Sequence, residues 1–284
     1  MSKRTGTVAK FVVAAGLLAV AAEAGVPLNG LQGNGGVAFN PLAYTAGTYA
    51  EGEKGGVGEW VSKPQVGAWY VNLNDADINW YAAGAAFSVA KRLELSYGYG
   101  LVDVDGTEIN THNLGAKFRF LDENYGDTVW VPALAVGGLW KTTDSDTADD
   151  LGVDDNGFDA YLVATKLITQ TPVPVLISGG VLRSDEIVNG VLGHGDYDTV
   201  LFGNVDILPA KNVAVGVEYK QGVDAGNSAA GNIQNSDYWD GHVAWFVTDK
   251  LTLVAAYVDT GDVGKGFSDL GVGGGFVLSA QYAF

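Results

Sequence analysis

From residue 64 onward, hydrophobic and polar side chains alternate along the chain, in segments separated by turn residues. In residues 93–101 the odd positions hold Leu or Tyr, and the even positions hold Glu, Ser or Gly. Residues 113–120, 213–220 and 276–284 alternate in the same way. Because successive side chains of a strand point to opposite faces, each segment predicts a strand with one apolar face and one small or polar face.

We predict twelve such strands, at 66–73, 78–89, 93–104, 111–121, 129–143, 158–169, 175–187, 199–209, 212–223, 237–248, 251–263 and 274–284. Most are close in length to the ~9–11 residues that a tilted strand needs to cross a bilayer. An even number is typical of single-chain bacterial barrels. The pattern therefore predicts an all-β fold: residues 65–284 form a transmembrane, antiparallel up-and-down β-barrel of about twelve strands.

The lengths of the connectors favour the same fold and predict its orientation. Short connectors lie at 90–92, 170–174, 210–211 and 249–250, and long ones at 144–157, 188–198, 224–236 and 264–273. Short and long connectors alternate in this way when tight turns face the periplasm and long loops face outside. We therefore expect both termini to be periplasmic. The connectors at 74–77 and 122–128 fit the alternation less well.

Residues 1–24 have the pattern of a signal peptide. Basic Lys3, Arg4 and Lys10 precede an apolar run at 11–22, and Ala22-Glu23-Ala24 matches the small-x-small cleavage pattern. An anchoring helix is the alternative, but the run is shorter than the ~20 residues that span a bilayer. The mature chain is expected to begin at Gly25.

Residues 25–64 do not read as a membrane strand. The stretch 25–36 is rich in Gly, and Pro41 interrupts the apolar run at 37–44. Proline has no amide hydrogen for a central ladder. Two interpretations stay open: a periplasmic extension or partial plug folded into the lumen, or a flexible leader with one short contact to the barrel.

Composition supports a protein of the bacterial envelope. Only 17% of the residues are charged and 47% are hydrophobic, with 41 Gly and no Cys. Soluble domains carry about 25% charged residues. The net charge of −17 argues against nucleic acid as a partner.

The last strand carries a more specific signal. Phe276, Leu278, Tyr282 and Phe284 lie at alternate positions, and Phe284 ends the chain. This pattern resembles the C-terminal assembly signal of bacterial outer-membrane, porin-like β-barrels, although no specific family is identified. The resemblance implies localisation in the cell outer membrane, contact with its lipid and lipopolysaccharide, and recognition by periplasmic chaperones and the barrel-insertion machinery.

Charged and polar residues occupy the predicted inner faces. These candidate lumen-lining residues are Glu94, Lys117, Arg119, Lys166, Arg183, Asn204, Asp206, Glu218, Lys220, Asp240, His242 and Gln281. A water-filled pore needs such a lining. A closed barrel needs the same residues as internal ion pairs. Twelve strands give a cylinder roughly 24 Å across, which leaves a passage of roughly 10 Å at most. Pattern alone does not choose between the two.

The long loops are acidic, and Asp144, Asp146, Asp149 and Asp150 are candidate ligands of a divalent cation. The run lacks the Gly at the sixth place and the Glu at the twelfth place of a calcium hand. A solvated, mutually repelling loop is the interpretation we favour.

Enzyme function has little support. Asp240-Gly-His242 and Asp103-Val-Asp105 loosely resemble the omptins, the outer-membrane aspartyl proteases, but those barrels have ten strands. In our topology the two pairs would lie far apart around the rim. The glycines at 271–275 are not followed by the Lys-Ser/Thr of a phosphate loop, so no cofactor is predicted.

The sequence therefore predicts a porin-like barrel, a monomer or a homo-oligomer such as a trimer, for passive passage of small solutes. The alternative is a closed structural or binding barrel that acts through its acidic extracellular loops. A third, a hydrolase at the outer rim, is the least supported.

Overall fold

A computed structural model describes residues 28–49, 57–144, 154–188, 191–192, 197–228, 231–263 and 271–284. The predicted signal peptide lies outside the described residues, as do Asp146, Asp149 and Asp150 of the acidic loop. Within the described part of the chain, no helix is long and apolar enough to cross a membrane.

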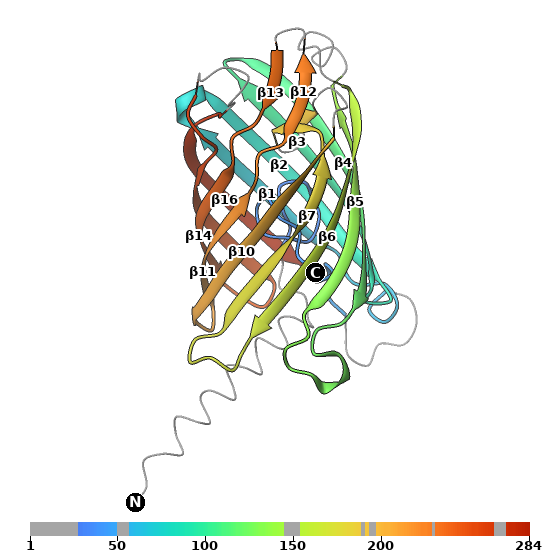
Figure 1. Cartoon of the computed structure of the whole chain (residues 1–284). Coiled ribbons are helices and arrows are strands. Elements are labelled where there is room, and N and C mark those ends of the chain that lie inside the picture. The colour runs from blue at the N-terminus through green and yellow to red at the C-terminus, as the bar shows by residue number, and fades with distance from the viewer. Residues whose placement is uncertain are drawn as a thin grey trace, which may run out of the picture.

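Twelve long strands build the barrel (Figure 1). They are β1 (Gln65–Leu73), β2 (Ile78–Val89), β3 (Leu93–Val104), β4 (Thr107–Leu121), β5 (Ala133–Thr143), β6 (Asn156–Ile168), β7 (Val175–Ser184), β10 (Asp198–Ala210), β11 (Val213–Lys220), β14 (Tyr238–Phe246), β15 (Leu251–Asp259) and β16 (Gly274–Ala283). Two short hairpins lie in the long loops: β8 (Glu186–Val188) with β9 (Val191–Leu192), and β12 (Asp224–Ser228) with β13 (Gly231–Gln234).

Each long strand pairs antiparallel with its neighbours along the chain, and the sheet closes where β1 pairs with β16. At this seam Gln65 lies opposite Ala283, and Leu73 lies opposite Gly275. The closed antiparallel barrel of twelve strands confirms the predicted fold. The orientation of its ends in a membrane stays a prediction.

The observed strands differ from the predicted ones mainly at their ends, where they meet the connectors. The strand predicted at 111–121 begins at Thr107, because Asp105 and Gly106 form a two-residue turn with φ of 50° and 84°. Asp-Gly favours such a turn, since both central residues need positive φ. The strand predicted at 129–143 begins at Ala133, because η2 (Tyr125–Asp127) and the residues after it form a turn.

The outward faces of the strands form an apolar band. Exposed outward residues include Leu95, Phe118, Leu162, Val217 and Leu278. At the end of the long loops, tyrosines donate hydrogen bonds to polar groups: Tyr70 to Asn79 at 2.8 Å, and Tyr219 to Asp237 at 2.6 Å. Amphipathic rings at the edge of an apolar band are typical of the membrane interface. The barrel therefore presents to its surroundings the surface of a transmembrane barrel.

Residues 28–46 lie inside the barrel (Figure 1). The wall around them carries buried polar side chains such as Glu94 and Lys117, together with buried apolar ones such as Trp69 and Val71. Asn29, Leu31 and Ala43 of this segment are almost completely buried. We call residues 28–46 the plug. The flexible-leader interpretation does not describe these residues, because they pack against the barrel wall.

Candidate functional site: the occupied lumen

The wall of β1, β2 and β3 carries a row of glycines that receives the plug. Gly67, Gly84 and Gly98 lie directly opposite one another on adjacent strands. A Cβ on Gly98 would lie 2.4 Å from the carbonyl oxygen of Gln32, and one on Gly84 would lie 2.5 Å from Cα of Gly33. Gly33 itself has φ of 85°. Because these positions lack side chains, the plug backbone lies directly on the sheet.

The end of the plug nearest the barrel seam is held by hydrogen bonds. The amide of Asn29 donates to Gln281 Oε1 at 2.8 Å, and the indole Nε1 of Trp69 donates to the Asn29 carbonyl at 2.8 Å. The side-chain amide of Gln65 donates to the Leu28 carbonyl at 2.9 Å. The backbone carbonyl of Leu28 and the backbone amide and carbonyl of Asn29 are thus satisfied by the wall, as burial requires.

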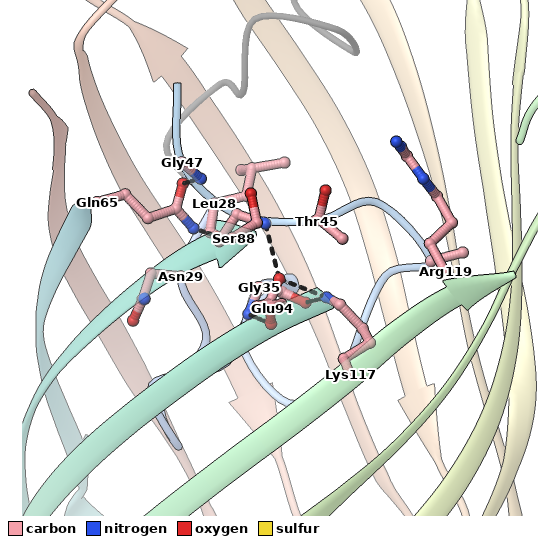
Figure 2. Close-up of polar contacts among 12 residues, drawn as sticks. Leu28, Asn29, Gly35, Thr45, Gly47, Gln65, Ser88, Glu94, Lys117 and Arg119 are labelled. Carbon is pink, nitrogen blue, oxygen red and sulfur yellow. Dashed lines mark hydrogen bonds and ion pairs between the residues drawn. The ribbon is translucent and has the colours of Figure 1, made fainter. Parts of the chain in front are cut away.

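Glu94 and Lys117 form the central anchor of the plug, as Figure 2 shows. The Glu94 carboxylate accepts the amide of Gly35 at 2.9 Å and that of Ala46 at 2.7 Å. The Lys117 ammonium lies 2.9 Å from Glu94 and donates to the Gly35 carbonyl at 2.9 Å. Both side chains are almost fully buried, so the ion pair and the plug depend on each other.

Glu218, on β11, holds the other side of the plug. Its carboxylate accepts the amides of Phe39, at 2.7 Å, and Asn40. The Asn40 side chain in turn donates to the carbonyls of Gly203 and Tyr219 on β10 and β11. The plug is therefore attached to β3 and β4 on one side and to β10 and β11 on the other.

A second element enters the lumen from the loop after β7. Glu186 forms ion pairs with Lys141 of β5 and Lys220 of β11, and Lys141 also pairs with Asp159 of β6. The side-chain amide of Gln32 in the plug donates to Glu186 at 3.0 Å. Burial opposes the charge of Glu186, but the two ammonium groups outweigh burial and hold its pKa below the usual range. The loop and the plug therefore meet inside the barrel.

A histidine bridges two carboxylates on the wall of β10 and β14. His242 Nε2 lies 2.7 Å from Asp206 and its Nδ1 lies 2.8 Å from Asp240. Asn204 donates to the other oxygen of Asp206 at 2.6 Å. Glu218 lies opposite Asp240 in the register of β11 and β14. The cluster gathers three carboxylates around one imidazole.

Most of the predicted lumen-lining residues point into the barrel, but two do not. Those that face inward are Glu94, Lys117, Arg119, Asn204, Asp206, Glu218, Lys220, Asp240, His242 and Gln281. Arg183 is exposed on the outer face of β7, 5.6 Å from the ring of Tyr197, so its assignment to the lumen is wrong. Leu182 and Ser184 take the inward positions beside it.

Lys166 also departs from the prediction. Thr165 and Leu167 on either side of it face inward, so its own position on β6 faces outward. Its ammonium donates to Glu123 at 2.8 Å and to Asn124, both in the turn between β4 and β5. Lys166 is 9% exposed and fastens this turn to the end of β6, where Glu123 also accepts a hydrogen bond from Tyr44 of the plug.

Several important interior residues were not predicted. Lys141, Asp159 and Glu186 are missing from the predicted set, as are the plug residues. The alternation on β5 and β6 could have identified Lys141 and Asp159, since both share a face with small or buried residues. The inward position of Glu186 depends on the path of a long loop, which has no periodic pattern.

The weaker site candidates are not assembled in the structure. Among the described residues no group of three or more His, Asp or Glu side chains has the arrangement of a metal site, and of the four acidic candidates only Asp144 is described. Asp103 lies on β3 and Asp240 on β14, and these strands are not neighbours in the barrel. The predicted separation of the Asp103/Asp105 pair from the Asp240/His242 pair is thus confirmed.

A family model described as "Protein of unknown function (DUF3034)" matches residues 25–279. The chain belongs to the DUF3034 family. A comparison with curated proteins found no match for this DUF3034 chain. Among solved structures, it is similar to the KdgM porin, with 11% identity and a TM-score of 0.52 over 78% of this chain and 99% of the other. The NanC porin is similar to the same degree, with 10% identity and a TM-score of 0.51 over 77% and 100%. These likenesses agree with the porin-like barrel fold of the DUF3034 chain.

Proposed function

We propose that this protein is a porin-like barrel of the bacterial outer membrane whose passage for small solutes is narrowed by its own N-terminal segment. The observation that carries the proposal is a closed barrel with an apolar outer band and buried charged and polar side chains in its interior. A polar interior suits water and small hydrophilic solutes, and lining charges select among them. The similar solved structures include two that are named as porins.

The plug sets the size of the passage in this proposal. Its backbone occupies the interior between β3 and β11, and Glu186 crosses from the loop to the wall of β5 and β11. The plug and Glu186 therefore take up part of the roughly 10 Å that twelve strands alone would leave, and the passage is narrower than that. Small conductance with the plug seated, and larger conductance without it, follow from this arrangement.

Planar-bilayer recordings test the proposal. The mature protein should give small discrete current steps, and a variant that lacks residues 28–49 should give larger ones. The double variant Asp103→Asn/Asp105→Asn, altered at the rim and not in the lumen, should keep the steps of the parent protein. Absence of discrete steps from both the mature protein and the deletion variant would overturn the proposal.

The second candidate is a closed barrel with a binding or structural role. The observation that favours it is the plug itself, since Glu94, Lys117 and Glu218 fix it with buried contacts. This candidate predicts no steps from the mature protein and none when the plug is shortened, so the same recordings separate the two.

Assembly in the outer membrane is part of the proposal. The expected assembly-signal residues Phe276, Leu278, Tyr282 and Phe284 all lie on the outer face of β16 or just after it. We expect Phe284→Ala to lower the amount of folded, heat-modifiable barrel in cells, and Ser279→Ala, on the inner face of the same strand, to leave it unchanged. Equal yields of both variants would contradict the role of the terminal aromatic residue.

A further inference from the structure

One half of the barrel interior is apolar near the short turns, where the plug does not fill it. The inward-facing side chains there are Leu167, Leu176, Leu208, Ala214, Ala244, Phe246 and Val254. They are continuous around the wall: Leu167 lies opposite Leu176, and Ala214, Ala244 and Val254 are in register on β11, β14 and β15. This surface differs from the polar lining that suits water and hydrophilic solutes.

These side chains line a cavity of about 350 Å³. Leu28, Val37 and Leu42 of the plug form its other side, and Asp206, His242 and Gln281 lie among its lining residues. The lining also includes the exposed turn residues Lys211, Thr248 and Asp249. The cavity is therefore reached from the end of the barrel that carries the short turns.

Size and lining together point to a class of ligand. Small-molecule sites are mostly apolar cavities of roughly 300–1,000 Å³ with a few polar groups that orient the ligand. An apolar cavity of about 150 Å³ is enough to hold benzene. We infer that this cavity binds a small, uncharged, mainly apolar molecule, such as a compound of one or two rings or a short alkyl chain.

The charges at the inner end of the cavity argue against an anionic ligand. Asp206 and Asp240 flank His242, and Glu218 lies opposite Asp240, so carboxylates outnumber the imidazole. An anionic head group placed at this boundary would be repelled and would lose its hydration. A hydroxyl or amide N–H on an otherwise apolar ligand would instead donate a hydrogen bond to Asp206 or Gln281. The inference does not rest on solute passage.

Photolabelling tests the site. Inward and outward side chains alternate along the same strands, so labelling of the cavity can be compared with labelling of the adjacent outer face. The probe is 3-trifluoromethyl-3-phenyldiazirine, an uncharged one-ring molecule that forms a carbene on illumination and inserts into nearby bonds. In the reconstituted mature protein, we expect it to label the inward residues Leu208, Ala214 and Ala244. Excess unlabelled naphthalene should abolish this labelling, as it does for a saturable site.

The neighbouring outward residues Ile207, Val215 and Val243 are the internal controls. They face the surrounding lipid, where the probe dissolves, so their labelling should not respond to the competitor. Labelling confined to the outward residues, or inward labelling that the competitor does not reduce, would overturn the inference.

Filling the cavity gives an independent check. Ala244→Trp places a large side chain in the cavity and should abolish the inward labelling, whereas Val243→Trp, on the outer face, should leave it unchanged. Heat-modifiable migration shows whether each variant is folded. If Ala244→Trp does not fold, Ala214→Phe replaces it, and the labelling pattern of the unaltered protein decides by itself. Conductance in planar bilayers is measured separately. A protein that conducts without inward labelling would contradict the cavity proposal alone, and one that is labelled without conducting would contradict the porin proposal alone.

Discussion

Lys117 and Glu94 form an ion pair of 2.9 Å inside the barrel, with each side chain only 1% exposed. The same two groups bond to the backbone of Gly35 in the plug. Because each charge is buried, removal of one leaves the other without compensation. The wall and the plug are thus stabilised by one shared set of contacts.

We expect Lys117→Met to lower the free energy of unfolding by about 3 kcal/mol or more, the usual cost of breaking a buried ion pair. Urea unfolding of the protein in lipid vesicles, followed by Trp fluorescence, measures the loss. The double variant Glu94→Gln/Lys117→Met should recover part of the loss, since it leaves no unpaired charge.

Arg92→Met is the matched control for this measurement. Arg92 pairs with Asp122, and both side chains are about 40% exposed. An exposed pair contributes about 0–1 kcal/mol. Losses of equal size for Lys117→Met and Arg92→Met would contradict the role given to the buried pair.

Gly98→Val should displace the plug. A Cβ at this position would overlap the carbonyl of Gln32 at 2.4 Å, and the plug backbone has to move away from the wall. We expect larger current steps in planar bilayers than those of the unaltered protein. Gly241→Val on β14 is the control, because a Cβ there meets no atom within 4 Å. An increase from both variants, or from neither, would show that plug contact with Gly98 does not limit the passage.

Asp185 should make stability depend on pH. Burial and the neighbouring Asp159 raise the pKa of Asp185 to about 6. A raised carboxyl pKa means that the folded protein disfavours the charged form. The protonated Asp185 carboxyl therefore favours the folded protein. Its contribution to the free energy of unfolding is complete below the unfolded pKa of about 4, and it is lost as pH rises through about 6.

We expect Asp185→Asn to be stabilising relative to the unaltered protein at pH 7.5, and to show little difference at pH 4. Urea unfolding at the two pH values measures this, with Asp249→Asn in an exposed turn as the control. A stability difference that is the same at both pH values would contradict the raised pKa.

The orientation of the barrel can be tested with single cysteines, because the chain contains none. Asp105, in the turn between β3 and β4, and Asp249, in the turn between β14 and β15, are both exposed and lie at opposite ends. On intact cells a membrane-impermeant maleimide should label Asp105→Cys. It should reach Asp249→Cys only after permeabilisation of the outer membrane. The reverse pattern would show that the short turns face outside.

The strands could be predicted because the pattern that specifies them is local. In parts of β3, β4 and β11 the large apolar side chains occupy every second position, since one face meets lipid and the other does not. In β7 both faces are apolar around Gly179 and Gly180, with Ile177 outward and Leu182 inward. The sequence of β7 therefore does not specify which face is which, and Arg183 was assigned to the wrong one.

The plug and the inward loop could not be predicted in the same way. The plug has no periodic pattern, and its structure is determined by partners far away in sequence, such as Gln281 for Asn29 and Glu186 for Gln32. The row formed by Gly67, Gly84 and Gly98 is visible only once the strands are in register. Contacts between residues so far apart in sequence form only in the completed barrel.

The bond between Asn29 and Gln281 joins residues 252 positions apart. Gln281 lies on β16, which closes the barrel against β1. The residues around Asn29 therefore reach their final contacts only when β16 is in place. Closure of the seam and seating of the plug depend on the same strand, so a barrel that is still open at β16 has no complete plug.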